Sequence, residues 1–151
     1  MNDVLNGITE YFKEKDIENK FKTIENSEYM DELIKRNRVP FINIIGFDKT
    51  RSPLNNYSRK NAETELYEIS IIICQDARFT KDVIKGTKTT ESIWSLSDYV
   101  YSLIEEDNTF NGVVNRLADQ DIRTTLTTLT KDNSVKVALE MKIFLIKDVF
   151  K

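Results

Sequence analysis

The sequence predicts an α+β fold in which an antiparallel sheet of about four strands, arranged as two hairpins, has helices packed on one face. Three observations support this prediction. Residues 65–77 and 134–150 show the period-two alternation of strands. Residues 3–15 and 92–106 carry apolar side chains at the three-and-four spacing of amphipathic helices. No linker, repeat or low-complexity tract divides residues 1–151, so we expect a single domain.

The first third of the chain predicts two helices. The apolar residues of the first helix, over about residues 3–15, fall on one stripe: Val4, Leu5, Ile8, Tyr11 and Phe12. Asn2 or Asp3 is placed to cap its first turn. After the pattern loses phase, residues 27–32 favour a short second helix, which Pro40 does not allow to continue.

A first hairpin is expected next. Residues 39–47 read as a strand in which Gly46 marks a bulge or bend, and residues 48–61 have the Ser, Pro and Asn content of a long loop. The second strand, 65–77, has four residues on its better-defined face: Tyr67, Ile69, Ile71 and Ile73.

The second half repeats this arrangement after a polar link over residues 77–90. The core stripe of the helix at 92–106 is Ile93, Leu96, Val100, Leu103 and Ile104. A threonine-rich strand centred on residues 121–129, a turn at 131–134 and a last strand at 134–150 follow. One parity of the last strand is apolar throughout: Val135, Val137, Leu139, Met141, Ile143 and Leu145.

Apolar residues also occur on what we expect to be the opposite face of the sheet: Ile42, Ile44, Ile72, Phe144 and Ile146. A two-layer fold leaves that face open, so either loops of the same chain or another chain must cover it. Both alternatives remain open at this point.

Composition excludes several kinds of chemistry. The chain has no histidine, which removes Ser-His-Asp and Cys-His nucleophilic systems and nearly all catalytic zinc sites. The formal charge is −3 from 25 acidic and 22 basic residues, so no overall basic field attracts nucleic acid or anionic membrane. The single cysteine, Cys74, has apolar neighbours and reads as a buried thiol.

The first residues lack the basic segment and following apolar run that are typical of a signal peptide. No apolar run in the sequence is long enough to span a membrane. We therefore expect a soluble protein that is made inside the cell, with no membrane partner.

An enzymatic function would need converging side chains. The candidates for a magnesium-dependent or acid–base site are acidic groups at Glu63 with Glu65, at residues 105–107, and at Asp119 with Asp121. Their placement along strands and at a helix end favours solvated surface, so we expect no enzyme, cofactor or metal site. The four glycines are scattered and form no phosphate-binding loop. RNA recognition would need a basic face or an aromatic strand motif, and the sequence has neither.

The element order, from about Val4 to Phe150, resembles that of the tail-terminator proteins of tailed bacteriophages and related contractile particles. The segments that carry this resemblance are YEISIIICQDA, IWSLSDYVYSLIEED and VKVALEMKIFLIKD, at residues 67–77, 93–107 and 135–148. The family has no short invariant motif, so no residue role transfers by motif. Related candidates are a head-to-tail adaptor or another neck or tail-completion protein.

The resemblance implies a non-enzymatic structural protein that forms a hexameric ring on the finished tail tube, stops its growth and joins it to the head or collar. Its partners would be copies of itself, the tail tube protein, in some particles the sheath, and a neck or head connector protein. DNA would pass through the ring without sequence-specific binding. The protein would lie in the bacterial host cytoplasm during assembly and then at the tail end of the virion.

Contact residues are predicted from pattern alone. The loop at 48–61 carries four basic residues, which can meet an acidic tube rim or DNA phosphate: Lys49, Arg51, Arg59 and Lys60. Trp94 and Tyr101 lie seven residues apart on one flank of a helix, as half-wet interface aromatics do. A second positive zone is expected from residues 35–38 together with Lys81, Lys85 and Lys88.

Overall fold

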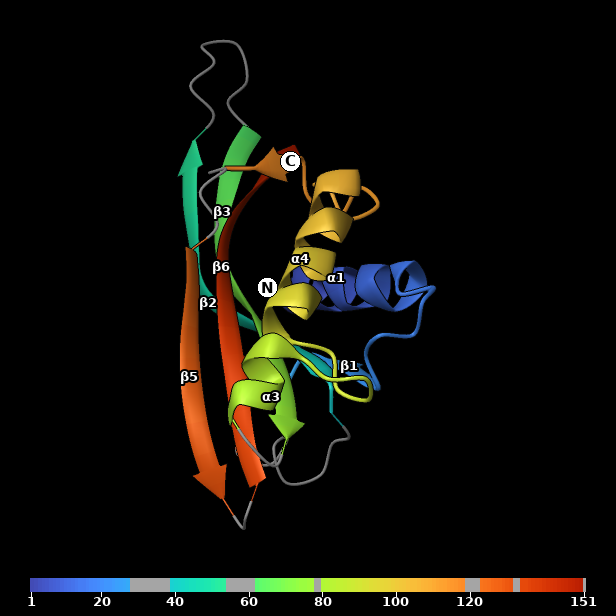
Figure 1. The fold of residues 1–151 in the computed structure, drawn as a ribbon. Coiled ribbons are helices and arrows are strands. Elements are labelled where there is room, and N and C mark those ends of the chain that lie inside the picture. Colours follow the sequence, from blue (N-terminus) through green and yellow to red (C-terminus); the bar gives the residue numbers. More distant parts are fainter. Residues whose placement is uncertain (28–38, 54–61, 78–79, 119–122, 132–133, 151) are drawn as a thin grey trace.

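The computed structural model of the protein describes residues 1–27, 39–53, 62–77, 80–118, 123–131 and 134–150. Its helices are α1 (Asn2–Lys15), α3 (Thr80–Lys85) and α4 (Ile93–Glu106). Its strands are β1 (Thr23–Glu25), β2 (Phe41–Pro53), β3 (Ala62–Ala77), β4 (Arg116–Leu117), β5 (Arg123–Lys131) and β6 (Ser134–Phe150). Figure 1 shows a long, curled sheet against which α1 and α4 pack.

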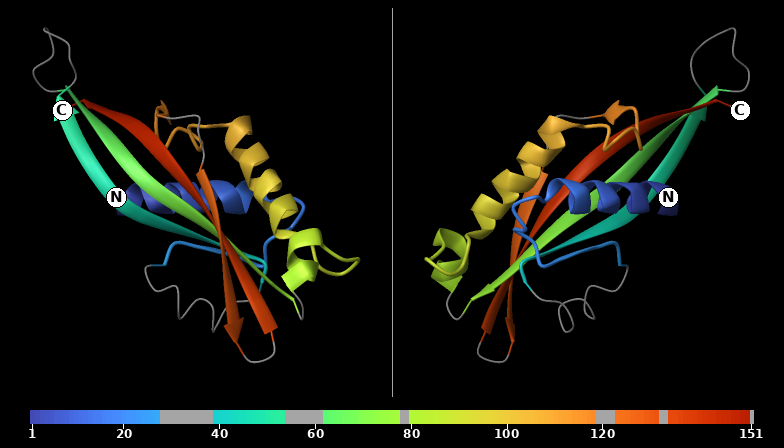
Figure 2. Two further views of the ribbon diagram at one scale, coloured as in Figure 1. Left: turned by 60° about the vertical axis from the view of Figure 1, so that its left-hand side comes forward. Right: turned by 90° about the vertical axis from the view of Figure 1, so that its right-hand side faces the viewer.

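The sheet is organised around two long antiparallel strands. β3 pairs with β6 from Ala62 opposite Phe150 to Ala77 opposite Val135. β2 pairs with the other side of β3, and β1 adds a short parallel strand beside residues 41–43 of β2. Because β3 occupies one edge of β6, β4 and β5 lie one after the other along its second edge. Figure 2 shows the twist that these long strands give the sheet.

The predicted fold class was wrong. The chain forms a mixed α/β structure with a curled sheet of six strands, not an antiparallel sheet of about four strands with helices packed on one face. The segment after α1, where the helical pattern loses phase, supplies the parallel strand β1. β1 and β4 are three and two residues long, which is too short for periodicity to reveal.

Two element boundaries also differ from the prediction. Residues 48–53, expected in a loop, continue β2 past a register shift between Gly46 and Asp48. Gly46 itself was expected to mark a bulge or bend, which the shift confirms, and the Met1 side chain occupies the space that a Cβ would need there. The expected polar link contains helix α3. The predicted second helix and most of the predicted loop lie outside the described residues.

The core lies between α1, α4 and one face of the sheet, called here the core face. α1 and α4 cross where the buried Tyr11 hydroxyl donates a hydrogen bond to the Leu103 carbonyl. The rings of Tyr11, Phe12 and Phe110 pack edge to face beside this contact. The Ser92 hydroxyl accepts a hydrogen bond from the Ser95 backbone amide and caps the first turn of α4. The contacts of Tyr11 and Phe12 fix α1 against α4 and the turn that follows it.

Burial confirms the predicted core parity of β3 and β6, but the faces assigned within β2 were wrong. Ile42 and Ile44 pair with Ile73 and Ile71 and are buried on the core face. The strand register confirms Ile72, Phe144 and Ile146 on the opposite face, called here the far face, and adds Ile45 and Leu66. Phe47 also lies there, with its ring beside Lys142. The bulge at Phe47 reverses the parity of β2, which the alternating pattern alone does not show.

Candidate assembly surfaces

Two of the longer strands, β2 and β5, have an open edge in the part of the chain that the structure describes. β1 pairs only with residues 41–43 of β2, so residues 44–53 lack a strand partner on that side. At the other edge of the sheet, β5 pairs with β6 and has no second partner among the described strands. Backbone N–H and C=O groups at such edges can add a strand from another chain.

β5 lacks the features that usually prevent edge pairing. Its sequence between Arg123 and Lys131 is TTLTTLT, with no charge, proline or glycine. Thr124, Thr125 and Thr127 are exposed, whereas Leu126 packs against the core. A long, uncharged, β-branched edge is a template for another strand. We therefore count the β5 edge and the β2 edge as candidate assembly surfaces.

The far face carries a partly exposed apolar patch towards the end of the sheet where β3 begins and β6 ends. Phe47 is 56% and Leu66 is 38% exposed, and Phe144 and Ile146 are half-buried beside them. The Lys142 ammonium lies 5.6 Å from the Phe47 ring centroid and pairs with Glu68 at 3.0 Å. An apolar patch rimmed by ion pairs is typical of a surface that contacts another protein.

A buried carboxylate organises the same end of the core face. The Glu65 side chain is 8% exposed and lies 2.7 Å from the Lys49 ammonium and 3.1 Å from Arg51 Nε. The Tyr67 hydroxyl donates a hydrogen bond of 2.9 Å to the other carboxylate oxygen of Glu65. Burial opposes ionisation of Glu65, but the hydrogen bonds from Lys49 and Tyr67 outweigh it and lower the pKa of the carboxyl. Glu65 was expected to lie on a solvated surface, and this expectation was wrong.

Helix α4 presents an exposed stripe of alternating aromatic and acidic residues, called here the α4 stripe: Trp94, Asp98, Tyr101 and Glu105. Their spacing of four, three and four residues places them on one flank of the helix. Trp94 is 42% and Tyr101 is 39% exposed. The Glu105 carboxylate raises the pKa of the Tyr101 phenol through a hydrogen bond and its charge. α4 contains no lysine or arginine, so nothing on the helix itself neutralises the stripe.

The structure gathers only part of the predicted contact set. Lys49 and Arg51 lie together on the core face of β2, where both contact Glu65. Trp94 and Tyr101 lie on α4, and no interaction links them with that basic pair in the described part of one chain. Arg59 and Lys60 lie outside the described residues, as does 35–38 of the second positive zone. Lys81 and Lys85 are in α3, with Lys88 in the loop after it.

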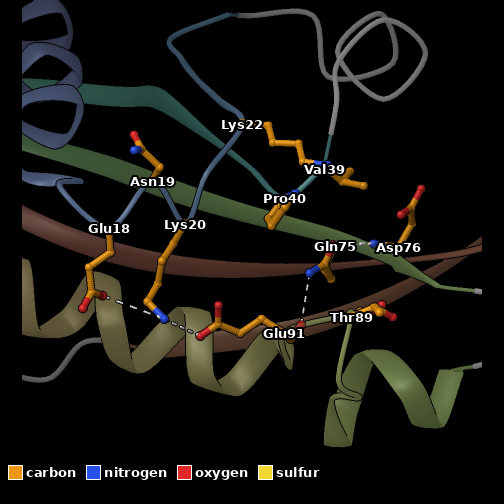
Figure 3. Close-up of a pocket in the computed structure, with 11 residues that line it drawn as sticks. Glu18, Asn19, Lys20, Lys22, Val39, Pro40, Gln75, Asp76, Thr89 and Glu91 are labelled. Carbon is orange, nitrogen blue, oxygen red and sulfur yellow. Dashed lines mark hydrogen bonds and ion pairs between the residues drawn. The ribbon is translucent and has the colours of Figure 1, made fainter.

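A polar pocket of about 560 Å³ opens between the loop after α1, the start of β2, the end of β3 and the segment before α4 (Figure 3). Lys20 bridges its walls, with its ammonium 2.7 Å from Glu91 and 3.9 Å from Glu18. The Gln75 amide donates to the Glu91 carbonyl at 3.0 Å. Lys20, Glu18 and Glu91 pair with one another, so these three side chains do not form a converging set for catalysis.

Within the described residues, no group of three or more cysteine and acidic side chains is placed to hold a metal ion. No helix there combines the length and apolar character that crossing a membrane requires. Scanning the chain against protein-family models gives no matching family, and comparison with curated proteins gives no match either. The candidate surfaces are therefore interpreted from their own geometry.

Sequence reasoning did not assign three residues to these surfaces, although it considered Glu65 and Glu105 as acidic candidates for an enzymatic site. Asp98 and Glu105 have the helical spacing that groups them with the predicted aromatics, and this spacing is a signal that could have found them. Glu65 has the same parity as the core residues of its strand, so the alternation of the strand predicts its burial. The open β2 edge had no signal, because its residues 48–53 read as a loop.

Proposed function

We propose that this protein is a ring-forming structural subunit of a phage or phage-like particle that caps the tail tube, ends its growth and joins it to the head or collar. The observation that carries the proposal is the pair of open edges at opposite sides of one sheet. The resemblance to tail terminators supplies the biological setting.

The directions of the two edge strands suit head-to-tail pairing. β2, β3, β6 and β5 are neighbours and alternate in direction, so β2 and β5 run antiparallel to each other. A second copy in the same orientation can then place its β2 beside β5 as the next antiparallel strand. Such a contact joins two different surfaces, and repeated contacts close into a ring when the rotation per copy allows it.

The two edges are also staggered along the strands. Asp48 is at the middle of the β2 edge. It pairs with Glu68 of β3, which in turn pairs with Phe144 of β6. Thr127, at the middle of β5, pairs with Ala138, which is six residues earlier in β6. When the centres of the two edges pair, each copy is shifted relative to its neighbour by about 20 Å along the strands. The four strands of one copy span about 19 Å across the sheet. A flat ring then needs strands tilted by about 45°, close to the tilt of closed β-barrels.

The size of such a ring fits the proposed role. Six copies would place four long strands each around a barrel roughly 50 Å across between opposing backbones. This width leaves room for inward side chains and for DNA to pass. The far face would line the barrel, and ion pairs on it join acids to bases, as in Glu68 with Lys142 and Asp148 with Arg116. A balanced surface favours passage over sequence-specific binding of DNA.

The exposed apolar patch around Phe47 and Leu66 supports docking to a protein. It lies where the first half of β3 pairs with the second half of β6, and Phe47 is next to the middle of the β2 edge. Apolar side chains rimmed by ion pairs suit contact with a tube or neck protein better than contact with DNA phosphate.

A head-to-tail adaptor is the second candidate, because the same edges and stagger also suit a ring at the neck. Electron microscopy of particles assembled without this protein separates the two functions. Tubes of uncontrolled, excessive length without heads would support tail termination. Tails of normal length that fail to join heads would favour the adaptor, and normal joined particles would contradict both.

A further inference from the structure

We propose that the α4 stripe of one copy binds Arg51 of the next copy in the ring. This inference rests on the proposed ring function and adds a second contact beside the paired sheet edges. Its binding chemistry is recognition of a guanidinium by two aromatic rings and two carboxylates. Trp94 and Tyr101 supply the rings, and Asp98 and Glu105 supply the carboxylates.

The stripe is unsatisfied within its own chain. Asp98 forms no ion pair or hydrogen bond with the described residues, and Glu105 interacts with the Tyr101 phenol but with no cation there. The neighbouring Glu106, on another side of the helix, does have a partner in Lys15, at 3.4 Å. Two carboxylates and two exposed rings on a helix that lacks lysine and arginine therefore present a site for an external cation.

Arg51 is the cation that the β2 edge offers. Its side chain is 59% exposed and uses Nε to contact Glu65, which leaves the terminal nitrogens of the guanidinium for a second partner. The neighbouring Lys49 ammonium is closer to Glu65, at 2.7 Å, and its side chain is only 26% exposed. Since Glu65 neutralises one of the two cations, the cluster keeps one net positive charge, which lies on its more exposed member.

The α4 stripe faces the edge to which the next copy would bind. Tyr99 donates a hydrogen bond to Asp16 after α1, so its flank of α4 faces α1. Helical geometry places the stripe on the other flank. α1 lies over β1 and β2 and α4 lies over β3 and β6, so the stripe faces the β5 edge.

The register brings the two groups to the same level. Pairing Asp48 with Thr127 between copies places Arg51 opposite Thr124, which pairs with Met141 on the core face. Along the sheet, the start of α4 lies beside Gln75, which pairs with Val137 of β6. The turn after α4 ends at Asn115, whose amide donates a hydrogen bond to the Ile146 carbonyl of β6. The middle of the stripe is therefore level with Thr124 and with the incoming Arg51.

The test uses two variants with opposite charges. In D98R/E105R the stripe becomes basic, and in R51E the incoming side chain becomes acidic. Each variant alone then brings like charges together at every contact, so we expect self-association to weaken at least about ten-fold in each. An equimolar mixture restores opposite charges at both kinds of contact and should reassemble as rings of alternating copies. Mass photometry or native mass spectrometry measures all three samples.

The matched control is E106R, a charge reversal on the same helix outside the stripe, which should assemble as the unmodified protein does. R51E places a second acid beside Glu65 and could lower the melting temperature. In that case R51A, which removes the guanidinium without adding an acid, tests the same contact. Rings that form equally well in every variant would overturn this contact and leave edge pairing intact. An unmodified protein that never self-associates, alone or on tail tubes, would overturn the proposed function as well.

Discussion

The Lys49 ammonium lies 2.7 Å from the Glu65 carboxylate, whose side chain is almost completely buried at the end of the core face. The two residues come from adjacent strands, Lys49 on β2 beyond the bulge and Glu65 on β3. Arg51 and Tyr67 complete the group. This pair therefore fixes the part of β2 that we assign to the ring contact.

Replacing Glu65 with glutamine should destabilise the protein by about 2 kcal/mol, since charged hydrogen bonds are lost while their donors stay partly buried. Chemical denaturation at neutral pH measures this change in the free energy of unfolding. Glu10→Gln is the matched control, because Glu10 is 74% exposed and pairs with Lys13 at 3.6 Å. Equal small effects of the two substitutions would contradict a structural role for Glu65.

The same carboxylate gives a pH dependence with a defined sign. The hydrogen bonds from Lys49 and Tyr67 overcome burial and lower the pKa of Glu65 in the folded state below its ordinary value of 4.5. Its stabilising contribution is therefore complete above the unfolded pKa and is lost as the pH falls through the folded pKa. Denaturation between neutral and acidic pH should show a smaller loss of stability below pH 4.5 in E65Q than in the unmodified protein.

Phe110→Ala should cost about 3–5 kcal/mol, because the fully buried ring packs against Tyr11 and Phe12. Phe110 has a φ of 52°, and alanine meets the same backbone restriction there, so the change reports mainly on the ring. Phe47→Ala removes a ring that is 56% exposed and should cost less than about 1 kcal/mol. Similar losses in thermal denaturation would contradict the assigned core.

The Cys74 thiol should react only when the protein unfolds. It is fully buried, and burial raises its pKa to about 12, so the reactive thiolate is scarce at neutral pH. Labelling by a disulfide reagent should therefore proceed at the rate at which the protein opens and should accelerate with denaturant. Rapid labelling under native conditions would show that the far face is open around Cys74.

Trp94→Ala and Tyr101→Ala should separate stability from assembly. Both side chains are exposed on α4, so each substitution should change the free energy of unfolding by less than about 0.5 kcal/mol. Because we assign both rings to the contact with Arg51 of the next copy, self-association should nevertheless weaken. Leu96→Ala, on the buried stripe of the same helix, should instead lower stability first. Sedimentation velocity together with denaturation distinguishes the two patterns.

Helices α1 and α4 and the strongly alternating strands β3 and β6 could be predicted from sequence, because one period dominates each segment. Strands β1 and β4 could not, since two or three residues define no period. β2 shows a further limit. Its bulge at Phe47 changes the face of every later residue, so Lys49 and Arg51 read as loop although they belong to the sheet.

The candidate surfaces also divide into features that local spacing predicts and features that depend on long-range pairing. The predicted Trp94 and Tyr101 are exposed on one flank of α4, since helical spacing fixes a face directly. The link between Arg51 and Glu65 depends on strand pairing across residues 54–61, which local pattern does not define. The open edges depend on the order of strands in the sheet, and this order follows from long-range pairing of β3 with β6.

Backbone hydrogen exchange, compared between the dilute and the assembled protein, tests pairing of the open edges most directly. Our account predicts that outward-facing amides of residues 44–53 and of β5 become protected on assembly, whereas amides of α3 exchange unchanged. Protection confined to other surfaces, or no change at either edge, would contradict a ring built through β2 and β5.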